Sequence, residues 1–314
     1  MAVSFVSGPV RVRVPATSAN LGPGFDALGL ALTLYDDVGA RVTDGGFRVT
    51  VTGEGAGELP DGEDHLVIRA ARATFDALDA VPPGLALECV NRIPQARGLG
   101  SSSAAIVAGV LLARELVTGG ADALDDADAL RLAAELEGHP DNVAACLLGG
   151  LTIAWREPGG ARAVSLTPAP GVRPMLFVPE ARGLTAAARA ALPETVPHAD
   201  AALNAGRAAL LVHALTARPS LLLAATEDRL HQRYRAGEAP ATFALVEALR
   251  AAGVAAVVSG AGPSVMALTE PPEQFAAGDG WSAWRVEVDR SGARVARGTL
   301  GHAERDPVAA GRTS

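Results

Sequence analysis

The stretch PQARGLGSSSAAIVAG, residues 94–109, places two glycines one residue apart, directly before three serines and a run of small apolar residues. The preceding segment, residues 85–94, reads LALECVNRIP and has the composition of a strand, whereas residues 101–117 have that of a helix that a serine can cap. Gly98 and Gly100 allow the backbone to turn tightly and to approach a ligand closely. We therefore predict a strand, a tight glycine loop and a helix.

The start of this predicted helix has the properties of an anion site. The first N–H groups of a helix have no partners within it, and the helix dipole adds roughly half a positive charge at that end. Ser101, Ser102 and Ser103 occupy this position, so the sequence predicts a phosphate site, and a serine hydroxyl there can also reach a magnesium ion held by the same phosphates. A loop that only connects a strand to a helix is the alternative.

The basic residues narrow the function classes, because all 27 of them are arginine. Walker A loops, protein kinases and pyridoxal enzymes each require a lysine, so all three classes are excluded. Without lysine, the loop has to hold phosphate by backbone N–H groups, by the helix dipole and by a magnesium ion.

Length and composition predict a globular protein of two domains. The chain has 314 residues, of which 49% are hydrophobic and 4% aromatic, so alanine, valine and leucine form most of the core. A net charge of −8 argues against a nucleic-acid partner. The sequence shows no leader and no membrane span, which predicts a cytoplasmic protein. Cys89 and Cys146 lie among apolar neighbours and are predicted to be buried small hydrophobes.

Mixed strands and helices in both halves predict an α+β fold. In the first half we expect strands at 10–14, 27–42, 47–55 and 149–155 and helices at 65–80 and 128–138. A change to proline and glycine at 156–172 predicts a domain boundary. In the second half we expect a strand at 175–179, helices at 199–216 and 240–253, and a strand, glycine loop and strand at 254–269. The residues from Gly301 onward have no periodic pattern and are predicted to form a loose tail.

The segment EGHPDN follows the helix at 128–138 and brings polar side chains together. Glu137, His139, Asp141 and Asn142 lie within six residues, and a carboxylate near a triphosphate is a natural magnesium ligand. Glu135 is close enough to compete for that role. A solvated helix end with an ordinary Asx turn is the alternative.

Two further loops are rich in glycine and short polar side chains. One of them, residues 17–26 (TSANLGPGFD), brings together Ser18, Asn20 and Asp26. This pattern is typical of a loop that binds a small polar substrate, and equally of a structural turn. SGAGPS, residues 259–264, allows the backbone to approach a ligand or the first glycine loop, and a tight hairpin is the alternative.

Taken in order, three loops resemble the motifs of the GHMP kinase superfamily. They are PATSANLGPGFDALG (15–29), PQARGLGSSSAA (94–105) and VVSGAGPSVMAL (257–268), and the match spans about residue 10 to residue 270. Together with EGHPDNVAACLLGGLT (137–152), the first of these loops resembles the homoserine kinase family more than the mevalonate, galactose or diphosphocytidyl-methylerythritol kinases.

The resemblance implies an enzyme that transfers the γ-phosphate of ATP to the side-chain hydroxyl of L-homoserine, giving O-phospho-L-homoserine and ADP in threonine biosynthesis. It implies a two-domain GHMP kinase fold. The N-terminal ATP-binding domain, residues 1–163, is similar to domain 2 of ribosomal protein S5 and has a left-handed βαβ crossover. The C-terminal domain, residues 164–300, is a ferredoxin-like α/β sandwich, and residues 301–314 are a flexible tail. A homodimer is also implied, with no nucleic-acid and no membrane partner.

The resemblance also assigns roles residue by residue, with ATP and Mg²⁺ as cofactors. The substrate-binding residues are Asn20, Asp26, His139, Asn142, Thr185, Arg189 and Arg235. The nucleotide-binding residues are Pro94, Arg97, Gly98, Leu99, Gly100, Ser101, Ser102, Ser103 and Ala104. The metal ligands are Ser102 and Glu137, and the catalytic residues are Asn142, Ser102 and Glu137.

The sequence departs from the wider superfamily at two positions. In mevalonate kinases the place of Asn142 belongs to an aspartate proposed as the general base, and asparagine cannot take a proton. We therefore expect transfer by positioning and charge neutralisation. Arg233 stands where the family commonly has proline, and it adds charge near Arg235. Two other functions stay open: a binding protein that has lost catalysis, and a kinase of another small molecule.

Overall fold

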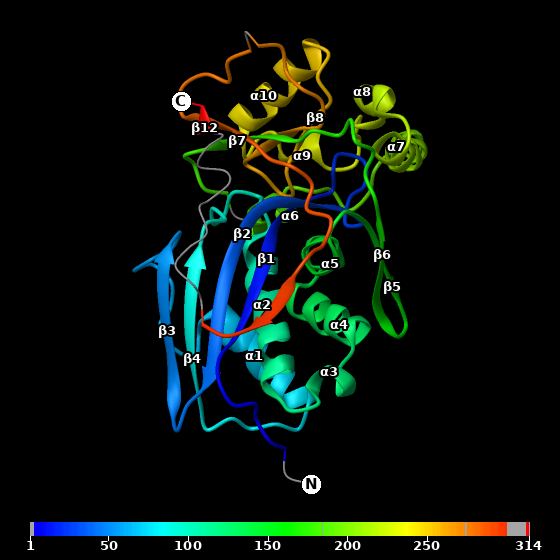
Figure 1. The fold of residues 1–314 in the computed structure, drawn as a ribbon. Coiled ribbons are helices and arrows are strands. Elements are labelled where there is room, and N and C mark those ends of the chain that lie inside the picture. The colour runs from blue at the N-terminus through cyan, green and yellow to red at the C-terminus, as the bar shows by residue number, and fades with distance from the viewer. Residues whose placement is uncertain (1–2, 184, 274, 300–311, 314) are drawn as a thin grey trace.

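The computed structural model describes residues 3–183, 185–273, 275–299 and 312–313, which form two sheets covered by helices. Figure 1 shows the larger sheet in the lower part of the molecule and the smaller sheet above it. The predicted α+β fold in two parts is therefore confirmed. Among the described residues, no helix is both long enough and apolar enough to cross a membrane.

The larger sheet has the order β11-β1-β2-β4-β3, with β5 paired to the first residues of β2 and β6 paired to β5. β3 and β4 run parallel and α1 connects them, which gives a βαβ crossover, whereas the other neighbours are antiparallel. The strands are β1 (Val10–Ala19), β2 (Leu28–Val42), β3 (Gly46–Gly53), β4 (Gly84–Asn91), β5 (Leu151–Glu157), β6 (Gly160–Leu166) and β11 (Arg294–Arg297).

Helices cover one face of this sheet, as Figure 1 shows. α2 is buried along most of its length, mainly through alanine, valine and leucine side chains, and it packs against α1, α4, α5 and strand β1. Gly109 of α2 lies directly against α1, where an added Cβ would collide with the backbone oxygen of Val67. The helices are α1 (Leu66–Ala77), α2 (Ser101–Leu116), α3 (Gly120–Ala123), α4 (Asp126–Glu137) and α5 (Pro140–Leu148).

The smaller sheet is antiparallel and has the order β12-β10-β7-β9-β8. Its strands are β7 (Met175–Pro179), β8 (Ala256–Val258), β9 (Val265–Ala267), β10 (Trp281–Arg285) and β12 (Arg312–Thr313). The helices of this domain are α6 (Thr185–Ala190), α7 (His198–Thr216), α8 (Leu222–Ala225), α9 (Gln232–Arg235) and α10 (Pro240–Ala251), with a 3₁₀ turn at Pro219–Leu221.

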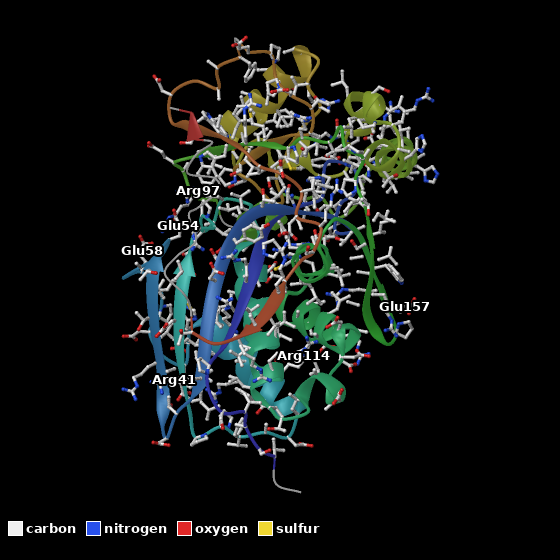
Figure 2. The ribbon with its side chains drawn as sticks, in the orientation of Figure 1. Arg41, Glu54, Glu58, Arg97, Arg114 and Glu157 are labelled. Atoms are coloured by element: carbon white, nitrogen blue, oxygen red, sulfur yellow. The ribbon has the colours of Figure 1, made fainter. Side chains whose placement is uncertain are left out.

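The two domains are joined at the glycine loop. Arg97 donates hydrogen bonds to the carbonyl oxygens of Pro179 (2.9 Å) and Glu180 (2.6 Å), and the Gly183 N–H donates to Ala96 O (2.8 Å). Figure 2 shows Arg97 at the level where the two domains meet. The start of α2 is therefore held by strand β7 and the residues that follow it.

Two local predictions need correction. The sequence pattern predicts no helix after HPDN, but His139 is the N-cap of α5 and Pro140 is its first residue. Proline suits this position because it lacks the N–H that would stay unpaired there. The predicted serine cap of α2 is also wrong, because Gly100 is the N-cap, with a left-handed φ of 71°, and no side chain caps the helix.

The segment predicted as a domain boundary contains a strand. The proline and glycine at 158–160 form the β5–β6 turn, and β6 extends across residue 163. The larger sheet therefore ends at Leu166, and β11 returns to it from the C-terminal half. The division at residue 163 stays a prediction. The predicted tail lies largely outside the described residues. Its residues 312 and 313 are described and form β12.

Glycine has opposite effects on stability in two helices. We expect Gly109→Ala to lower the free energy of unfolding by about 1–3 kcal/mol, because the new methyl group collides with α1. In α7, a Cβ at Gly206 would have no atom within 4 Å. Gly206→Ala should therefore raise the free energy of unfolding by about 0.5–1 kcal/mol, since alanine favours a helix. Urea unfolding of both variants measures the difference. Equal changes in the two helices would contradict the close packing of α1 on α2.

Candidate active site

A cavity of about 390 Å³ lies between the glycine loop, the start of α5, the loop after β1 and the loop between β8 and β9. Four segments that are far apart in the sequence therefore meet at one place. Most of the predicted site residues line it: Asn20, Asp26, Pro94, Arg97, Gly98, Leu99, Gly100, Ser101, Ser102, Ala104, Glu137, His139, Asn142, Arg189 and Arg235.

The glycine loop is held by close backbone contacts. Gly98 and Gly100 both have φ values of 71°, which favour glycine. A Cβ on Gly98 would collide with the backbone oxygen of Ser259, and the Ser259 hydroxyl donates to Gly98 O at 2.7 Å. The loop at 259–264 thus contacts the first glycine loop, as one of the two interpretations predicted, and it is also the hairpin between β8 and β9.

Glu137 of α4 faces the first turn of α2. Its Oε1 accepts hydrogen bonds from the hydroxyls of Ser102 (2.7 Å) and Ser103 (2.9 Å). Glu135 is exposed and does not line the cavity, so geometry separates the two carboxylates that the sequence left open. The start of α2, two hydroxyls and one carboxylate therefore lie side by side.

The start of α5 carries two side chains that face the cavity. His139 donates from Nδ1 to Oδ1 of the buried Asp141 at 2.7 Å. Burial lowers the pKa of His139, but the hydrogen bond and the negative charge of Asp141 raise it by more, so the net shift is upward. The same carboxylate oxygen accepts from the Asn142 N–H at 2.9 Å, and Asn142 Oδ1 accepts from the Thr17 hydroxyl at 2.8 Å.

Opposite charges meet at the loop after β1. Arg189 of α6 forms a bidentate ion pair with Asp26, with Nη2–Oδ1 at 2.7 Å and Nη1–Oδ2 at 3.2 Å. Asp26 has a φ of 54°, and its N–H donates to Asn20 Oδ1 at 2.9 Å. Asn20 in turn donates to Gly260 O at 2.8 Å. The loop therefore presents the Asp26 carboxylate to the second domain.

Arg235 is the second cation at this end of the cavity. Its side chain is buried and donates from Nε to Ala188 O (3.0 Å) and from Nη1 to His231 Nδ1 (3.1 Å). His231 donates from Nε2 to Gly22 O at 2.8 Å, and burial lowers its pKa, so the ring is neutral. The Phe25 ring stacks on His231 and lies beneath the Arg235 guanidinium. This packing fixes the direction of Arg235.

The other end of the cavity is mostly apolar. Its walls come from residues such as Val38, Leu59 and Val67. His65 also lines it: Nδ1 accepts from the Val67 N–H at 3.3 Å, so Nε2 carries the ring proton, and this buried N–H has no partner among the described residues. Asp36 accepts from two backbone N–H groups, and burial raises its pKa to about 7.

Three residues named from the sequence stand apart from the cavity or have other partners, and the side chain of a fourth is not described. Three of the five Arg97 N–H groups bind backbone carbonyls, so its phosphate-binding role stays a prediction. Ser103 is fully buried under Glu137. Arg233 does not line the cavity and forms an ion pair with Asp200 at 2.6 Å. The Thr185 side chain lies outside the described residues.

Sequence reasoning gave no role to five residues that the structure places at or beside the site: Thr17, Asp36, His65, Asp141 and His231. Each is buried and is a partner of a cavity residue or lines the cavity itself. Thr17 and Asp141 lie inside the quoted motifs, and this position could have marked them as site residues. Asp36 lies in strand β2, and His65 and His231 directly precede α1 and α9, where nothing local marks them.

Comparisons with known proteins place the chain among kinases. The family model described as the GHMP kinases N terminal domain matches residues 65–150, and the one described as GHMP kinases C terminal matches residues 199–284. The first match contains the glycine loop, Glu137 and HPDN, and the second contains Arg235 and the loop at 259–264.

Relatives are similar to this chain along almost their whole length. A homoserine kinase of Streptomyces avermitilis is 58% identical over 296 residues, which cover 93% of this chain and 97% of the relative. That of Streptomyces coelicolor is also 58% identical, with 93% and 96% covered. Among solved structures, the homoserine kinase from Cytophaga hutchinsonii has a TM-score of 0.79 at 28% identity and covers 94% of this chain and 100% of that chain.

Asp36 and its neighbour Asp37 should give opposite pH effects. The pKa of Asp36 is raised from 3.8 to about 7, so its contribution to stability is present below pH 3.8 and is lost as pH rises through 7. Asp36→Asn should therefore raise the free energy of unfolding at pH 8 by as much as about 4 kcal/mol.

Asp37 is the matched control. Burial raises its pKa, but hydrogen bonds from Arg13 and Arg92 lower it by more, so its contribution is present above pH 3.8 and is lost as pH falls. Asp37→Asn should therefore lower stability at pH 8. Urea unfolding at pH 5 and pH 8 tests both variants, and a loss of stability at pH 8 in both would contradict the assignment for Asp36.

Proposed function

We propose that this chain, which belongs to the homoserine kinase family of the GHMP kinases, transfers the γ-phosphate of ATP to the side-chain hydroxyl of L-homoserine. The observation that carries the proposal is one cavity with two kinds of site. A helix N-terminus suited to phosphate lies at the glycine loop, and a set of opposite charges suited to an amino acid lies across from it.

The phosphates of ATP would lie on the glycine loop. Without a side-chain cap, the first N–H groups of α2 are free to donate to an anion, and the left-handed Gly98 and Gly100 bring the backbone close to it. No lysine is needed there, because the helix dipole and the N–H groups supply the positive potential. The Arg97 guanidinium supports the loop through its bonds to the second domain.

The base of the nucleotide would enter the apolar end of the cavity. Its walls can contact both faces of a flat ring, and the unpaired Nε2–H of His65 can donate to a ring nitrogen or a ribose oxygen. A buried donor without a partner carries a free-energy cost, so its pairing with a ligand favours binding. This end lies on the N-terminal domain, as the glycine loop does.

The residues present fit a magnesium ion. Magnesium prefers oxygen ligands and commonly binds one or two protein oxygens together with substrate phosphates. Glu137 and the Ser102 hydroxyl supply such oxygens beside the phosphate site, whereas the described residues hold no cluster of three or more His, Cys, Asp or Glu. We assign Glu137 and Ser102 as ligands. Bound there, the ion would neutralise phosphate charge during transfer.

L-Homoserine would bind at the ion pair of Asp26 and Arg189. In the free protein these charges neutralise each other, and a substrate with an ammonium and a carboxylate can take one partner each. The ammonium would meet Asp26, and the carboxylate would meet Arg189 and the fixed Arg235. Such charge-assisted hydrogen bonds contribute roughly 1.5–3 kcal/mol each. Thr185, Asn20 and His139 complete the proposed substrate site.

The reaction itself would be a direct displacement. The side-chain oxygen of homoserine forms a bond to the γ-phosphorus while the bond from that phosphorus to the β–γ bridging oxygen breaks, and ADP leaves with the electron pair. Asn142 cannot accept the hydroxyl proton, so the proton passes to an oxygen of the transferred phosphoryl group. A loose transition state suits this route, because little proton transfer is required before the bond to ADP has broken.

Several finer predictions stay predictions: the cytoplasmic location, the homodimer and the place in threonine biosynthesis. A binding protein without catalysis would retain the cavity and would also bind ATP. Another small-molecule kinase would act on a different alcohol. Substrate screening separates both from the proposed function.

The first experiment measures ATP consumption with Mg²⁺ and L-homoserine, beside mevalonate, L-threonine, a sugar and 4-hydroxybutyrate, which lacks the ammonium group. We expect a product heavier by one phosphoryl group with homoserine and little with the others, because only homoserine offers both charges and a primary hydroxyl. ATP binding with no turnover on any of these compounds would favour the binding protein. Turnover on mevalonate or a sugar would favour another kinase.

Glu137 and Glu135 form a matched pair for the metal. Glu137→Gln should lower kcat by roughly 100-fold or more and weaken Mg²⁺-dependent ATP binding, because it removes the charge beside the phosphates. Glu135→Gln should change neither by more than about 3-fold, because an exposed side chain outside the cavity touches no ligand. Calorimetric titration with ATP at several magnesium concentrations measures binding. A larger effect from Glu135 would overturn the assignment.

A further inference from the structure

Thr17, near the end of β1, is fully buried between the two halves of the proposed active site. Its hydroxyl donates to Oδ1 of Asn142 at 2.8 Å, and its backbone N–H donates to Leu99 O in the glycine loop at 3.0 Å. One residue therefore contacts both the loop proposed for phosphate and the side chain proposed to lie beside the homoserine hydroxyl.

The contact with the glycine loop is tight. A Cβ on Gly100 would collide with the Thr17 hydroxyl and would lie 3.3 Å from Asn142 Oδ1. The left-handed φ of Gly100 and this lack of space act together, so only glycine brings the start of α2 this near to β1. The Thr17 hydroxyl, the Asn142 amide and the phosphate loop are thus fixed relative to one another.

Asn142 is held at two points. Its backbone N–H donates to Asp141 Oδ1 at 2.9 Å, and its side-chain oxygen accepts from Thr17. With Oδ1 directed to Thr17, the amide nitrogen is directed away from the Thr17 hydroxyl, since both atoms are bonded to the same trigonal carbon. Asn142 lines the cavity, so its NH₂ group is the polar group left for a ligand.

We infer that Thr17 is a positioning residue that fixes the Asn142 amide with its NH₂ group toward the reacting centre, so that Asn142 acts as a hydrogen-bond donor there. The inference rests on the proposed function. The donor would meet an equatorial oxygen of the transferred phosphoryl group, since the charge of the transition state is spread over these oxygens. A fixed donor aimed at developing charge needs no reorganisation when the reaction occurs.

Free rotation of the amide would weaken this arrangement. Without the Thr17 hydroxyl, the Asn142 side chain can turn its oxygen toward the cavity, where it repels a phosphate oxygen instead of stabilising it. The loss should appear in kcat and not in the affinity for ATP, because the ground-state phosphates are held by the backbone of the glycine loop. A residue that only supports the fold would not separate the two quantities.

The experiment compares Thr17→Val, which removes the hydroxyl at nearly constant size, with Thr17→Ser, which retains it. We expect Thr17→Val to lower kcat for homoserine roughly 10- to 100-fold while the KM for ATP changes by less than about 3-fold. Thr17→Ser should retain most of the kcat of the wild type, because its hydroxyl can still donate to Asn142. In an Asn142→Ala background, Thr17→Val should change kcat by less than about 2-fold, because the group that it positions is gone.

Three outcomes would overturn the inference. An unchanged kcat in Thr17→Val would show that the hydroxyl does not position Asn142. An equal loss with and without Asn142 would show a structural role alone. If Thr17→Val does not fold, Asn142→Asp gives the test, because it retains an acceptor for Thr17 and replaces the donor by a carboxylate oxygen. A kcat equal to or above that of the wild type would then refute the donor role.

The wild-type protein separates this inference from the proposed function. If it does not phosphorylate homoserine, the proposed function and the inference both fail. If it does so and Thr17→Val is as fast, only the inference fails.

Discussion

The close approach of three backbones at the glycine loop is the constraint on which the rest of the site depends. Gly98 contacts the loop at 259–264, and Gly100 contacts Thr17 of β1, and neither position has room for a Cβ atom. Because both glycines also have left-handed φ values, the loop can begin α2 with its N–H groups free and directed to the cavity. The two domains therefore meet around a helix N-terminus that their backbones hold, at the place proposed for phosphate.

Charge in the cavity is balanced locally. Asp26 faces Arg189, Asp141 faces His139, and Glu137 accepts from two serine hydroxyls. Each carboxylate thus has a partner before any ligand binds, which lowers the cost of holding charge in a partly buried place. In the proposed function, a zwitterionic substrate would exchange one such pair for two new ones, and a nucleotide would use backbone groups that carry no net charge. A chain without lysine can bind phosphate in this way.

Sequence patterns located most of the elements, and most of the predicted site residues line the cavity. The failures have physical causes. HPDN was missed as a helix start because proline is a helix breaker except at the first position, and the pattern alone does not give the position. The serine cap was wrong because Gly100, in a left-handed conformation, already ends the loop. The proline and glycine at 158–160 were a hairpin turn within a sheet, and not a linker.

The sequence by itself determined which segments carry the chemistry, because glycine, serine, asparagine and the lack of lysine restrict the local backbone and the available groups. Only the tertiary structure decided which side chains act together. Thr17 and Asn142 lie 125 residues apart, and Asp26 and Arg189 lie 163 apart. The tertiary structure also distinguished Glu137 from Glu135, because only Glu137 faces the first turn of α2. Such contacts depend on packing between distant elements, which leaves no mark in local spacing.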